Sequence, residues 1–301
     1  MARAKRKKGT VGIVGLGIMG GSFARNLTAA GWHVVGYDLD AGRRRSLARV
    51  GVEIAKDAVD VAAKCAMVIT SLPSPQALDA TVNALVAAKL KKRIIVECST
   101  FTLDDKQRAE RALRKAGHTL LDCPVSGTGA QAAVKDLVIY ASGDTAAIKK
   151  TRRVFADFSR AMHDLGPFGN GSKMKYVANL LVAINNVASA EAMVLGMKAG
   201  LDPQMIFEMV TGGAGNSRVF ELRAPMMVKN RYDDVTMKVK IWQKDMAVIG
   251  AYVQELGVPT PTFSATLPVY AAAMSTGHAM DDTAAVCAVL EKQAGVRRKK
   301  R

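Results

Sequence analysis

The sequence of 301 residues is poor in the residue types on which disulfide and metal chemistry depend. It has four cysteines and four histidines. The cysteines show no CxxC spacing and each lies in an apolar stretch, so we expect reduced, buried thiols at Cys65, Cys98, Cys123 and Cys287. The histidines form no pair at metal-ligand spacing. The sequence therefore predicts a chemistry that uses no metal ion.

Long hydrophobic runs are also missing. No stretch of about 18 consecutive apolar residues occurs, which is the length that a membrane-spanning helix needs. The N-terminus begins with a basic run at residues 2–8 and lacks the apolar segment of a secretory signal. We therefore expect a cytosolic protein. With 49% apolar residues the chain can bury a substantial core, and its length favours two domains.

The formal net charge of +17 is concentrated at the two ends. Residues 1–8 hold five Lys or Arg and residues 297–301 hold five more; without these ten, 33 cations face 26 acidic residues. Basic tails can bind nucleic acid or anionic surfaces, but solvated, disordered ends are the commoner meaning of such termini. The alternative of a cofactor-sensing protein that binds nucleic acid through its tails stays open at this point.

Short β-branched runs alternate with helical stretches from Thr10 to about Leu165, which is typical of a parallel α/β sheet. After Gly171 strand signals vanish, and Ala-, Met- and Leu-rich segments with helical period run to about Lys292, the first of them from Ser172 to about Lys198. Expected strands are Val11–Val14, His33–Tyr37, Met67–Ser71, Arg93–Glu97, Thr119–Asp122 and Leu137–Ala141, the last two extending the same sheet. The expected organisation is a basic tail at 1–9, an α/β domain with a mainly parallel sheet at 10–168, an all-α domain at 169–292, and a basic tail at 293–301.

A GxGxxG motif at residues 15–20 follows an apolar strand and precedes a helix. Gly15 permits the tight turn, Gly17 lets a pyrophosphate approach the backbone, and Gly20 lets the helix pack closely on the strand. Asp38 ends the second strand, where a carboxylate accepts hydrogen bonds from the adenosine ribose. Its charge favours NAD, although Arg43, Arg44 and Arg45 leave NADP possible.

Two further clusters carry polar groups. In residues 122–130, DCPVSGTGA, a strand ends in a glycine-rich turn with a hydroxyl and free backbone amides, which is either an anion cradle or an ordinary turn. At the start of the long helix, Lys175 and Asn179 are four residues apart and share a face, and Gly171 is expected to leave open space beside the lysine. A solvated pair at a helix start is the commoner meaning of such residues.

In the order and spacing of GLGIMG, DCPVSGTGA, GxGxxxKxxxN and Lys244-Asp245, the chain resembles the β-hydroxyacid dehydrogenase family, which includes 3-hydroxyisobutyrate dehydrogenases and tartronate semialdehyde reductases. The resemblance runs from about residue 10 to 292. It implies that cofactor would be bound by Gly15, Gly17, Ile18, Met19, Gly20, Asp38, Leu72, Pro73, Ser99, Thr100 and Lys244, with Ser99 and Thr100 near the nicotinamide and Lys244 closing over the site. Substrate would be bound by Ser126, Gly127 and Thr128. Lys175 would be the catalytic acid/base, and Asn179 would position the substrate.

Together with the motif at residues 15–20, the same resemblance implies that residues 10–168 form a dinucleotide-binding domain of the Rossmann type and residues 169–292 a domain for substrate binding and oligomerisation. It also implies an active site in the cleft between these domains, a homodimer or homotetramer, and reversible hydride transfer between a nicotinamide cofactor and a small 3-hydroxy carboxylate or its semialdehyde. Thr128 stands where a second Gly is usual and Leu103 where a Pro is frequent. Ala178 replaces the His of 6-phosphogluconate dehydrogenases, and Lys175 is the lysine that imine reductases of this architecture generally lack. Both of these superfamily branches are therefore disfavoured, and the pairing of Lys175 with Asn179 argues against a protein that only binds nucleic acid.

Overall fold

The computed structural model describes residues 8–298, which form two compact units divided between Lys175 and Tyr176. Most of the two basic tails expected from the sequence lies outside the described residues. Within them, Lys8 pairs with Asp157 at 2.8 Å. Arg298 donates to the carbonyl oxygen of Val228 at 2.9 Å and pairs with Glu291, so this cation belongs to the packed structure rather than to a solvated tail.

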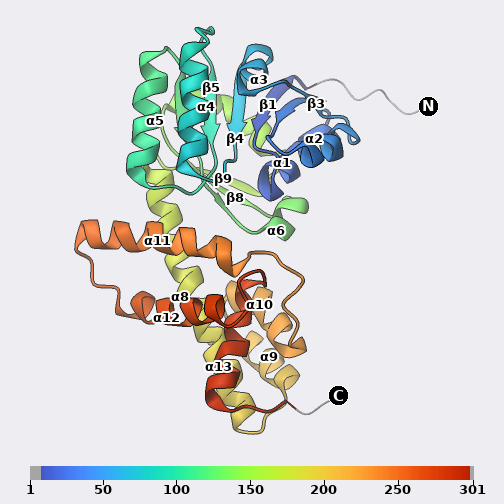
Figure 1. Cartoon of the computed structure of the whole chain (residues 1–301), viewed down its shortest axis with the longest axis vertical. Coiled ribbons are helices and arrows are strands. Elements are labelled where there is room, and N and C mark those ends of the chain that lie inside the picture. Colours follow the sequence, from blue (N-terminus) through green and yellow to red (C-terminus); the bar gives the residue numbers. More distant parts are fainter. Residues whose placement is uncertain (1–7, 299–301) are drawn as a thin grey trace. The chain divides into compact units, whose positions relative to one another are not determined.

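The first unit contains a six-stranded parallel sheet in the order β3-β2-β1-β4-β5-β6 (Figure 1). Its strands are β1 (Thr10–Val14), β2 (His33–Tyr37), β3 (Glu53–Ile54), β4 (Met67–Thr70), β5 (Ile94–Glu97) and β6 (Thr119–Asp122). Successive apolar residues of each strand enter opposite faces, because side chains alternate along a strand. Ile69 lies in one buried cluster and Val68 in the other. Burial on both faces accounts for the continuous apolar runs from which the strands were predicted.

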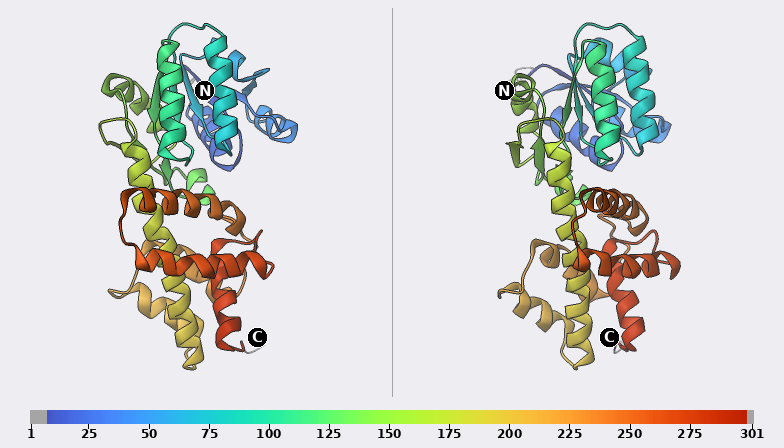
Figure 2. Two further views of the ribbon diagram at one scale, coloured as in Figure 1. Left: turned by 60° about the vertical axis from the view of Figure 1, so that its left-hand side comes forward. Right: turned by 90° about the vertical axis from the view of Figure 1, so that its left-hand side faces the viewer.

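Helices cover both faces of this sheet. They are α1 (Ile18–Ala29), α2 (Ala41–Ala48), α3 (Ala58–Lys64), α4 (Pro75–Ala87), α5 (Leu103–Lys115) and α7 (Thr145–Phe155). Figure 2 shows α4 and α5 side by side, and they share one buried cluster with α3. Phe23 of α1 and Phe155 of α7 lie in the cluster on the other face. Side-chain caps fix several helix starts, such as Ser74 at α4 and Thr102 at α5.

A second, three-stranded sheet corrects one expectation. The strand expected at Leu137–Ala141 is β8 (Val138–Ala141), and it does not extend the main sheet: it pairs antiparallel with β7 (Val125–Ser126) and parallel with β9 (Ala161–Asp164). A single bridge, Asp122 with Ser142, connects its end to β6. The physical reason is that β7 is close in the chain and offers a local antiparallel edge, which needs no long crossover. The helix α6 (Gly129–Ala133) lies between β7 and β8 in the chain.

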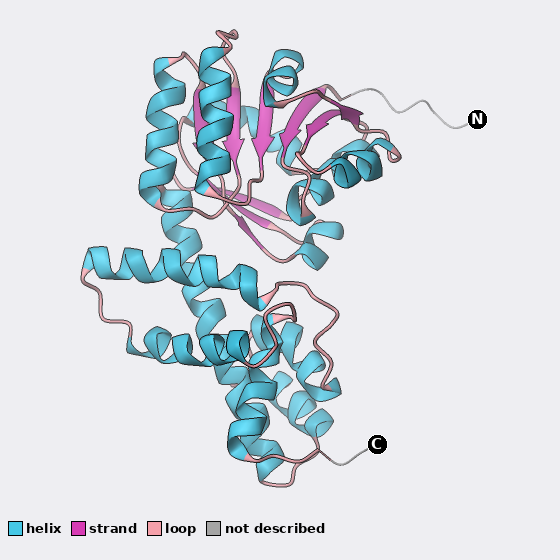
Figure 3. Ribbon diagram, in the orientation of Figure 1, coloured by secondary structure: helices cyan, strands magenta, loops and turns pink. Residues whose placement is uncertain are grey.

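In the second unit the described residues form helices joined by loops and contain no strand, as the sequence predicts (Figure 3). Trp242, Phe263 and Tyr270 lie in its apolar core. The elements are α8 (Asn170–Lys198), which begins in the first unit, α9 (Pro203–Thr211), α10 (Arg218–Lys229), α11 (Val239–Leu256), α12 (Pro261–Ser275), a 3-10 turn η1 (Thr283–Ala285) and α13 (Val286–Ala294). The α/β domain with a mainly parallel sheet followed by an all-α region is thus confirmed.

The long helix α8 is the one described helix whose length and mean hydropathy, 1.5 in its most apolar window, would suffice to cross a membrane. Core helices of soluble proteins meet the same criterion. Ala183, Val187 and Met193 of α8 belong to the apolar core of the second unit. We therefore interpret α8 as a core helix.

Candidate active site

Apart from Lys244, which lies in α11, the candidate cofactor residues follow the carboxyl ends of parallel strands. The glycine loop follows β1, Asp38 follows β2, Leu72 and Pro73 follow β4, and Ser99 and Thr100 follow β5. Parallel strands bring these ends to one edge of the sheet. Strands β2 and β3 lie on one side of β1, and β4, β5 and β6 lie on its other side, so the strand order reverses at β1. Dinucleotides bind at such a reversal of strand order.

The glycine loop fits the pyrophosphate of a dinucleotide. Gly15 has φ +91°, and a Cβ atom there would lie 2.1 Å from the carbonyl oxygen of Ser71; a Cβ atom on Gly20 would lie 1.9 Å from that of Gly15. A Cβ atom on Gly17, in contrast, would have Arg43 Nη1 as its nearest neighbour, at 3.6 Å. Gly17 precedes α1 and offers no side chain to its first amides, which have no partner within the helix. Phosphate oxygens can therefore take that place.

Asp38 joins the end of β2 to this loop. Its Oδ2 accepts a hydrogen bond from the Leu16 amide at 2.7 Å, and its Oδ1 accepts one from the Asp40 amide at 2.8 Å. Arg43 Nη1 lies 3.3 Å from Oδ2. A cavity of about 320 Å³ between α1 and α2 is lined by Gly17 and Arg43 among other residues. The carboxylate is thus held near the glycine loop, with a cation beside it that weakens its negative charge.

Ser99 links the loops after β4 and β5. Its Oγ accepts a hydrogen bond from the Leu72 amide at 2.8 Å, and its own amide donates to Glu97 Oε1 at 2.8 Å. Pro73 and Thr100 continue the same two loops. The structure therefore brings together two of the segments that the resemblance assigns to the cofactor.

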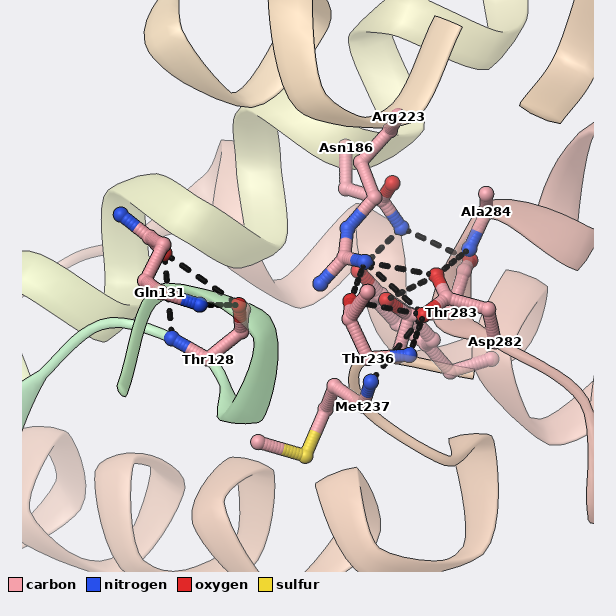
Figure 4. Close-up of polar contacts among 10 residues, drawn as sticks. Thr128, Gln131, Asn186, Arg223, Thr236, Met237, Asp282, Thr283 and Ala284 are labelled. Atoms are coloured by element: carbon pink, nitrogen blue, oxygen red, sulfur yellow. Dashed lines mark hydrogen bonds and ion pairs between the residues drawn. The ribbon is translucent and has the colours of Figure 1, made fainter. Parts of the chain in front are cut away.

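The turn expected to hold a carboxylate begins in β7 at Ser126. Gly127 has φ +135°, a conformation that a residue with a side chain rarely adopts. Thr128 begins α6: its Oγ1 accepts from the Gln131 amide at 3.5 Å and its amide donates to Gln131 Oε1 at 3.0 Å (Figure 4). This capping box is a role for Thr128 that the sequence analysis missed, and T-x-x-Q is its sequence signal.

Lys175 lies directly against this turn. Its side chain is buried, with 7% exposed, and Nζ donates to the carbonyl oxygen of Val125 at 2.7 Å. Gly171, one turn earlier, does not leave the open space that we expected. A Cβ atom there would lie 2.4 Å from the carbonyl oxygen of Tyr140 and 2.7 Å from that of Asp122. The space beside Gly171 is filled by backbone, so this glycine is needed for close packing of the helix start.

Asn179 and Lys244 meet at a third residue. Asn179 Nδ2 donates to Asp245 Oδ2 at 2.9 Å, and Lys244 Nζ lies 3.2 Å from Asp245 Oδ1. Asn179 and Asp245 are both buried, with 4% and 8% exposed. Asp245 therefore orients both residues that the resemblance places at the site. The sequence analysis quoted Asp245 only as part of a motif, since nothing in the chain order shows its contact with a residue 66 positions earlier.

The cysteines take no part in this arrangement. All four are free and buried, which confirms the prediction. Burial raises the pKa of the Cys65 thiol to about 12 and that of Cys287 to about 12, so these thiols stay protonated and unreactive. Among residues 8–298, no group of three or more His, Cys, Asp or Glu side chains is placed to hold a metal ion.

Comparison with known proteins finds matches to both parts of the chain. A family model described as the NAD binding domain of 6-phosphogluconate dehydrogenase matches residues 10–166, and one described as NAD-binding of NADP-dependent 3-hydroxyisobutyrate dehydrogenase matches residues 169–290. The chain is 30% identical to L-threonate dehydrogenase of Cupriavidus necator, over 92% of this chain and 94% of that protein. It is 28% identical to 2-hydroxy-3-oxopropionate reductase of Escherichia coli K12, over 94% of this chain and 98% of that protein.

Among solved structures, 3-hydroxyisobutyrate dehydrogenase from Salmonella typhimurium superposes with a TM-score of 0.84 at 28% identity, covering 93% of this chain and 99% of that one. An imine reductase from Myxococcus stipitatus in complex with NADP+ reaches a TM-score of 0.61 at 16% identity, covering 93% of this chain and 99% of that one, which shows a shared fold alone. Both halves of the chain match one enzyme family, and its relatives are matched over nearly their whole length. The chain therefore belongs to the β-hydroxyacid dehydrogenase family of NAD(P)-dependent oxidoreductases.

Proposed function

We propose that Lys175 is the general acid/base for reversible oxidation of a small 3-hydroxy carboxylate, or reduction of its semialdehyde, anchored at Ser126 and Gly127. The observation that carries this proposal is the 2.7 Å hydrogen bond from Lys175 Nζ to the carbonyl oxygen of Val125, the residue before Ser126. It fixes a buried amine beside the turn that offers a hydroxyl and backbone donors to an anion.

The proposed oxidation removes one proton and one hydride from the substrate, and Lys175 takes the proton. During oxidation the substrate hydroxyl loses its proton to the Lys175 amine, the carbon–oxygen double bond forms, and the hydrogen on that carbon leaves with its electron pair. A bound nicotinamide cofactor supplies the acceptor for this hydride. In the reducing direction the Lys175 ammonium returns the proton to the oxygen. The glycine loop, Asp38 and Ser99 would hold the cofactor.

Related enzymes differ in substrate, so the substrate is best found by a screen. The relatives named above are an L-threonate dehydrogenase, a 2-hydroxy-3-oxopropionate reductase and a 3-hydroxyisobutyrate dehydrogenase. We propose that this chain accepts one member of this class of small hydroxy acids. Cofactor reduction, followed by absorbance with a panel of such acids and both cofactors, tests the proposal. Turnover of no panel member, at enzyme concentrations at which reduced cofactor binds, would reject it.

The anchor predicts discrimination between charged and neutral substrates. Ser126→Ala is expected to raise KM for the acid about 10-fold and change kcat less, because a hydrogen bond to a charged group is lost in ground and transition state alike. The amide analogue of the substrate should react poorly with the unmodified enzyme. Steady-state kinetics with acid and amide check this. Equal turnover of the two by the unmodified enzyme would remove the carboxylate anchor from the mechanism.

We further propose that Asp38 makes NAD the preferred cofactor. Asp38→Ala is expected to raise KM for NAD about 10-fold and to narrow the preference for NAD over NADP, since it removes a ribose acceptor and frees Arg43 to meet a phosphate. The measurement is kcat/KM for both cofactors. Arg45→Ala is the control on the same helix, because among the described residues Asp38 pairs with Arg43 and not with Arg45, and it should leave the ratio unchanged. An unmodified enzyme that prefers NADP would overturn this assignment.

We infer that the chain forms a homo-oligomer, a dimer or a tetramer. Val177, Leu181 and Leu195 lie along one stripe of α8 and are 54%, 52% and 73% exposed, an apolar surface that association with another copy would cover. Size-exclusion chromatography with light scattering measures the mass in solution. A monomer at micromolar concentration would contradict the inference.

A further inference from the structure

A buried cluster of charged side chains lies beneath the candidate site. Lys106 of α5, Glu97 at the end of β5 and Asp122 at the end of β6 each have no exposed surface. Lys106 Nζ lies 2.7 Å from Asp122 Oδ1 in hydrogen-bonding geometry, and 2.8 Å from Glu97 Oε2 as an ion pair outside that geometry. Buried ion pairs are poor stabilisers, because removing three charges from water offsets much of their attraction. The role of these three charged side chains is therefore better inferred from the other groups that the two carboxylates bind.

Each carboxylate has a second partner in the candidate site. Glu97 Oε1 accepts from the Ser99 amide at 2.8 Å. Asp122 Oδ2 accepts from the Ser172 amide at 2.7 Å, and its Oδ1 accepts from the Ser172 hydroxyl at 2.8 Å. One side of the cluster therefore leads to the loop that the resemblance assigns to the nicotinamide. The other side leads to the start of α8.

The start of α8 depends on Asp122 because its own sequence provides no cap. The residue before the helix is Gly169, which has no side chain. Asp122 supplies the acceptor that an N-cap residue usually supplies, and Ser142 Oγ accepts from the Gly171 amide at 3.0 Å. A carboxylate at this end also meets the positive end of the helix dipole. Lys175 follows Ser172 by three residues, so it sits one turn beyond this anchor.

We propose that Lys106, Glu97 and Asp122 are positioning residues: Lys106 holds the two carboxylates, which place Ser99 and the first turn of α8, and through that turn Lys175. The proposal rests on the proposed function of Lys175. The pKa of Lys106 is consistent with it: burial lowers this pKa, but the nearby negative charges of Asp122 and Glu97 outweigh burial and raise it. Lys106 thus stays a cation between the two carboxylates.

The test uses two variants matched in what they remove. Asp122→Ala and Glu97→Ala each take away one of the two partners of Lys106 and leave the other. Asp122→Ala is expected to lower kcat about 10- to 100-fold and to leave the affinity for reduced cofactor within about 2-fold, because a displaced acid/base slows chemistry. Glu97→Ala is expected to raise the Kd of reduced cofactor about 10-fold and to lower kcat at saturating cofactor by less than about 3-fold.

A merely structural role predicts a different pattern. Both variants would then lose thermal stability and keep kcat and the Kd of reduced cofactor per folded active site, and that result would overturn the proposal. A fall in kcat alone in both variants, or a rise in Kd alone in both, would overturn it as well. Ser172→Ala is the milder variant should Asp122→Ala not fold; it removes one hydrogen bond to Asp122 and should lower kcat about 3- to 10-fold. An unchanged kcat in Ser172→Ala would then overturn the α8 side of the proposal.

Two readouts need no turnover. Fluorescence titration with NADH gives the cofactor Kd of Glu97→Ala, and hydrogen exchange gives the protection of the Ser172 amide, which Asp122→Ala should lower at least about 10-fold. If Lys175→Met kept full activity, the proposed function would be wrong, but the change in cofactor Kd and the change in Ser172 amide protection would still test whether the cluster positions Ser99 and the start of α8. If Lys175→Met were inactive and neither shift appeared, the positioning alone would fail.

Discussion

Lys175→Met is expected to lower kcat about 100- to 10,000-fold, which is the usual contribution of general acid/base catalysis. Met keeps much of the side-chain volume and cannot carry the proton. Because Lys175 is buried and its Nζ bonds the carbonyl oxygen of Val125, we expect a stability loss of about 1 kcal/mol, which is small beside the kinetic effect. Cofactor affinity should stay within about 2-fold. Steady-state turnover, NADH titration and thermal unfolding measure the three quantities.

The matched control is Lys173→Met, on the same turn of α8. Lys173 is exposed and lies on a different face of the helix from Lys175. Its replacement should change kcat by less than about 2-fold, since substitution of an exposed side chain usually has a small effect. An inactive Lys173 variant, or activity retained in both variants, would mean that the first turn of α8 does not carry the acid/base.

Gly171→Ala is the second change with a large expected effect. The new Cβ would lie 2.4 Å from the carbonyl oxygen of Tyr140 and 2.7 Å from that of Asp122, and backbone atoms cannot turn aside as a flexible side chain can. The start of α8 must then move. We expect about 1–3 kcal/mol lower stability, as for overpacking elsewhere, and a kcat about 100-fold lower, because a shift of about 1 Å at a catalytic group costs that much.

Gly250→Ala is the control for the introduction of alanine into a helix. Gly250 lies in α11, and apart from its chain neighbours and the backbone of its own helix, no described atom lies within 4 Å of its Cβ position. Alanine there should raise stability by about 0.5–1 kcal/mol through its better helix propensity. Chemical denaturation compares the two variants. Equal stability of Gly171→Ala and the unmodified chain would contradict the close packing of the start of α8 against β6 and β8.

Much of the fold could be predicted because the signals were local. The strands of the parallel sheet are buried on both faces and read as apolar runs, and the glycine loop has its own spacing. The elements that were missed are short or exposed: β3 and β7 have two residues each, and β9 is partly exposed. The placement of β8 could not be predicted from its composition, since its sheet is determined by the neighbouring strands β7 and β9, which were not predicted.

The site, too, could be predicted only where its signals were local in the sequence. Glycine spacing and the lysine–asparagine pair were visible in the sequence, but Gly171 was misinterpreted because the atoms beside it come from segments 31 and 49 positions earlier. The buried cluster had one signal that was not used. Lys106 occupies the same face of α5 as Ala109 and Leu113, so its helical position marked it as buried even though its charge suggested a solvated residue. The cytosolic location and the role of the basic ends stay predictions.

The capping of α8 by Asp122 also bears on the order in which the chain folds. The acceptor for the Ser172 amide stands 50 residues earlier in the chain, so closing this contact costs the entropy of a long loop. The interior of α8 can form from local bonds, whereas its first turn has to wait until β6 and the bridge to Ser142 are in place. Lys175 is therefore expected to reach its position late in folding, after the strands that anchor the start of α8.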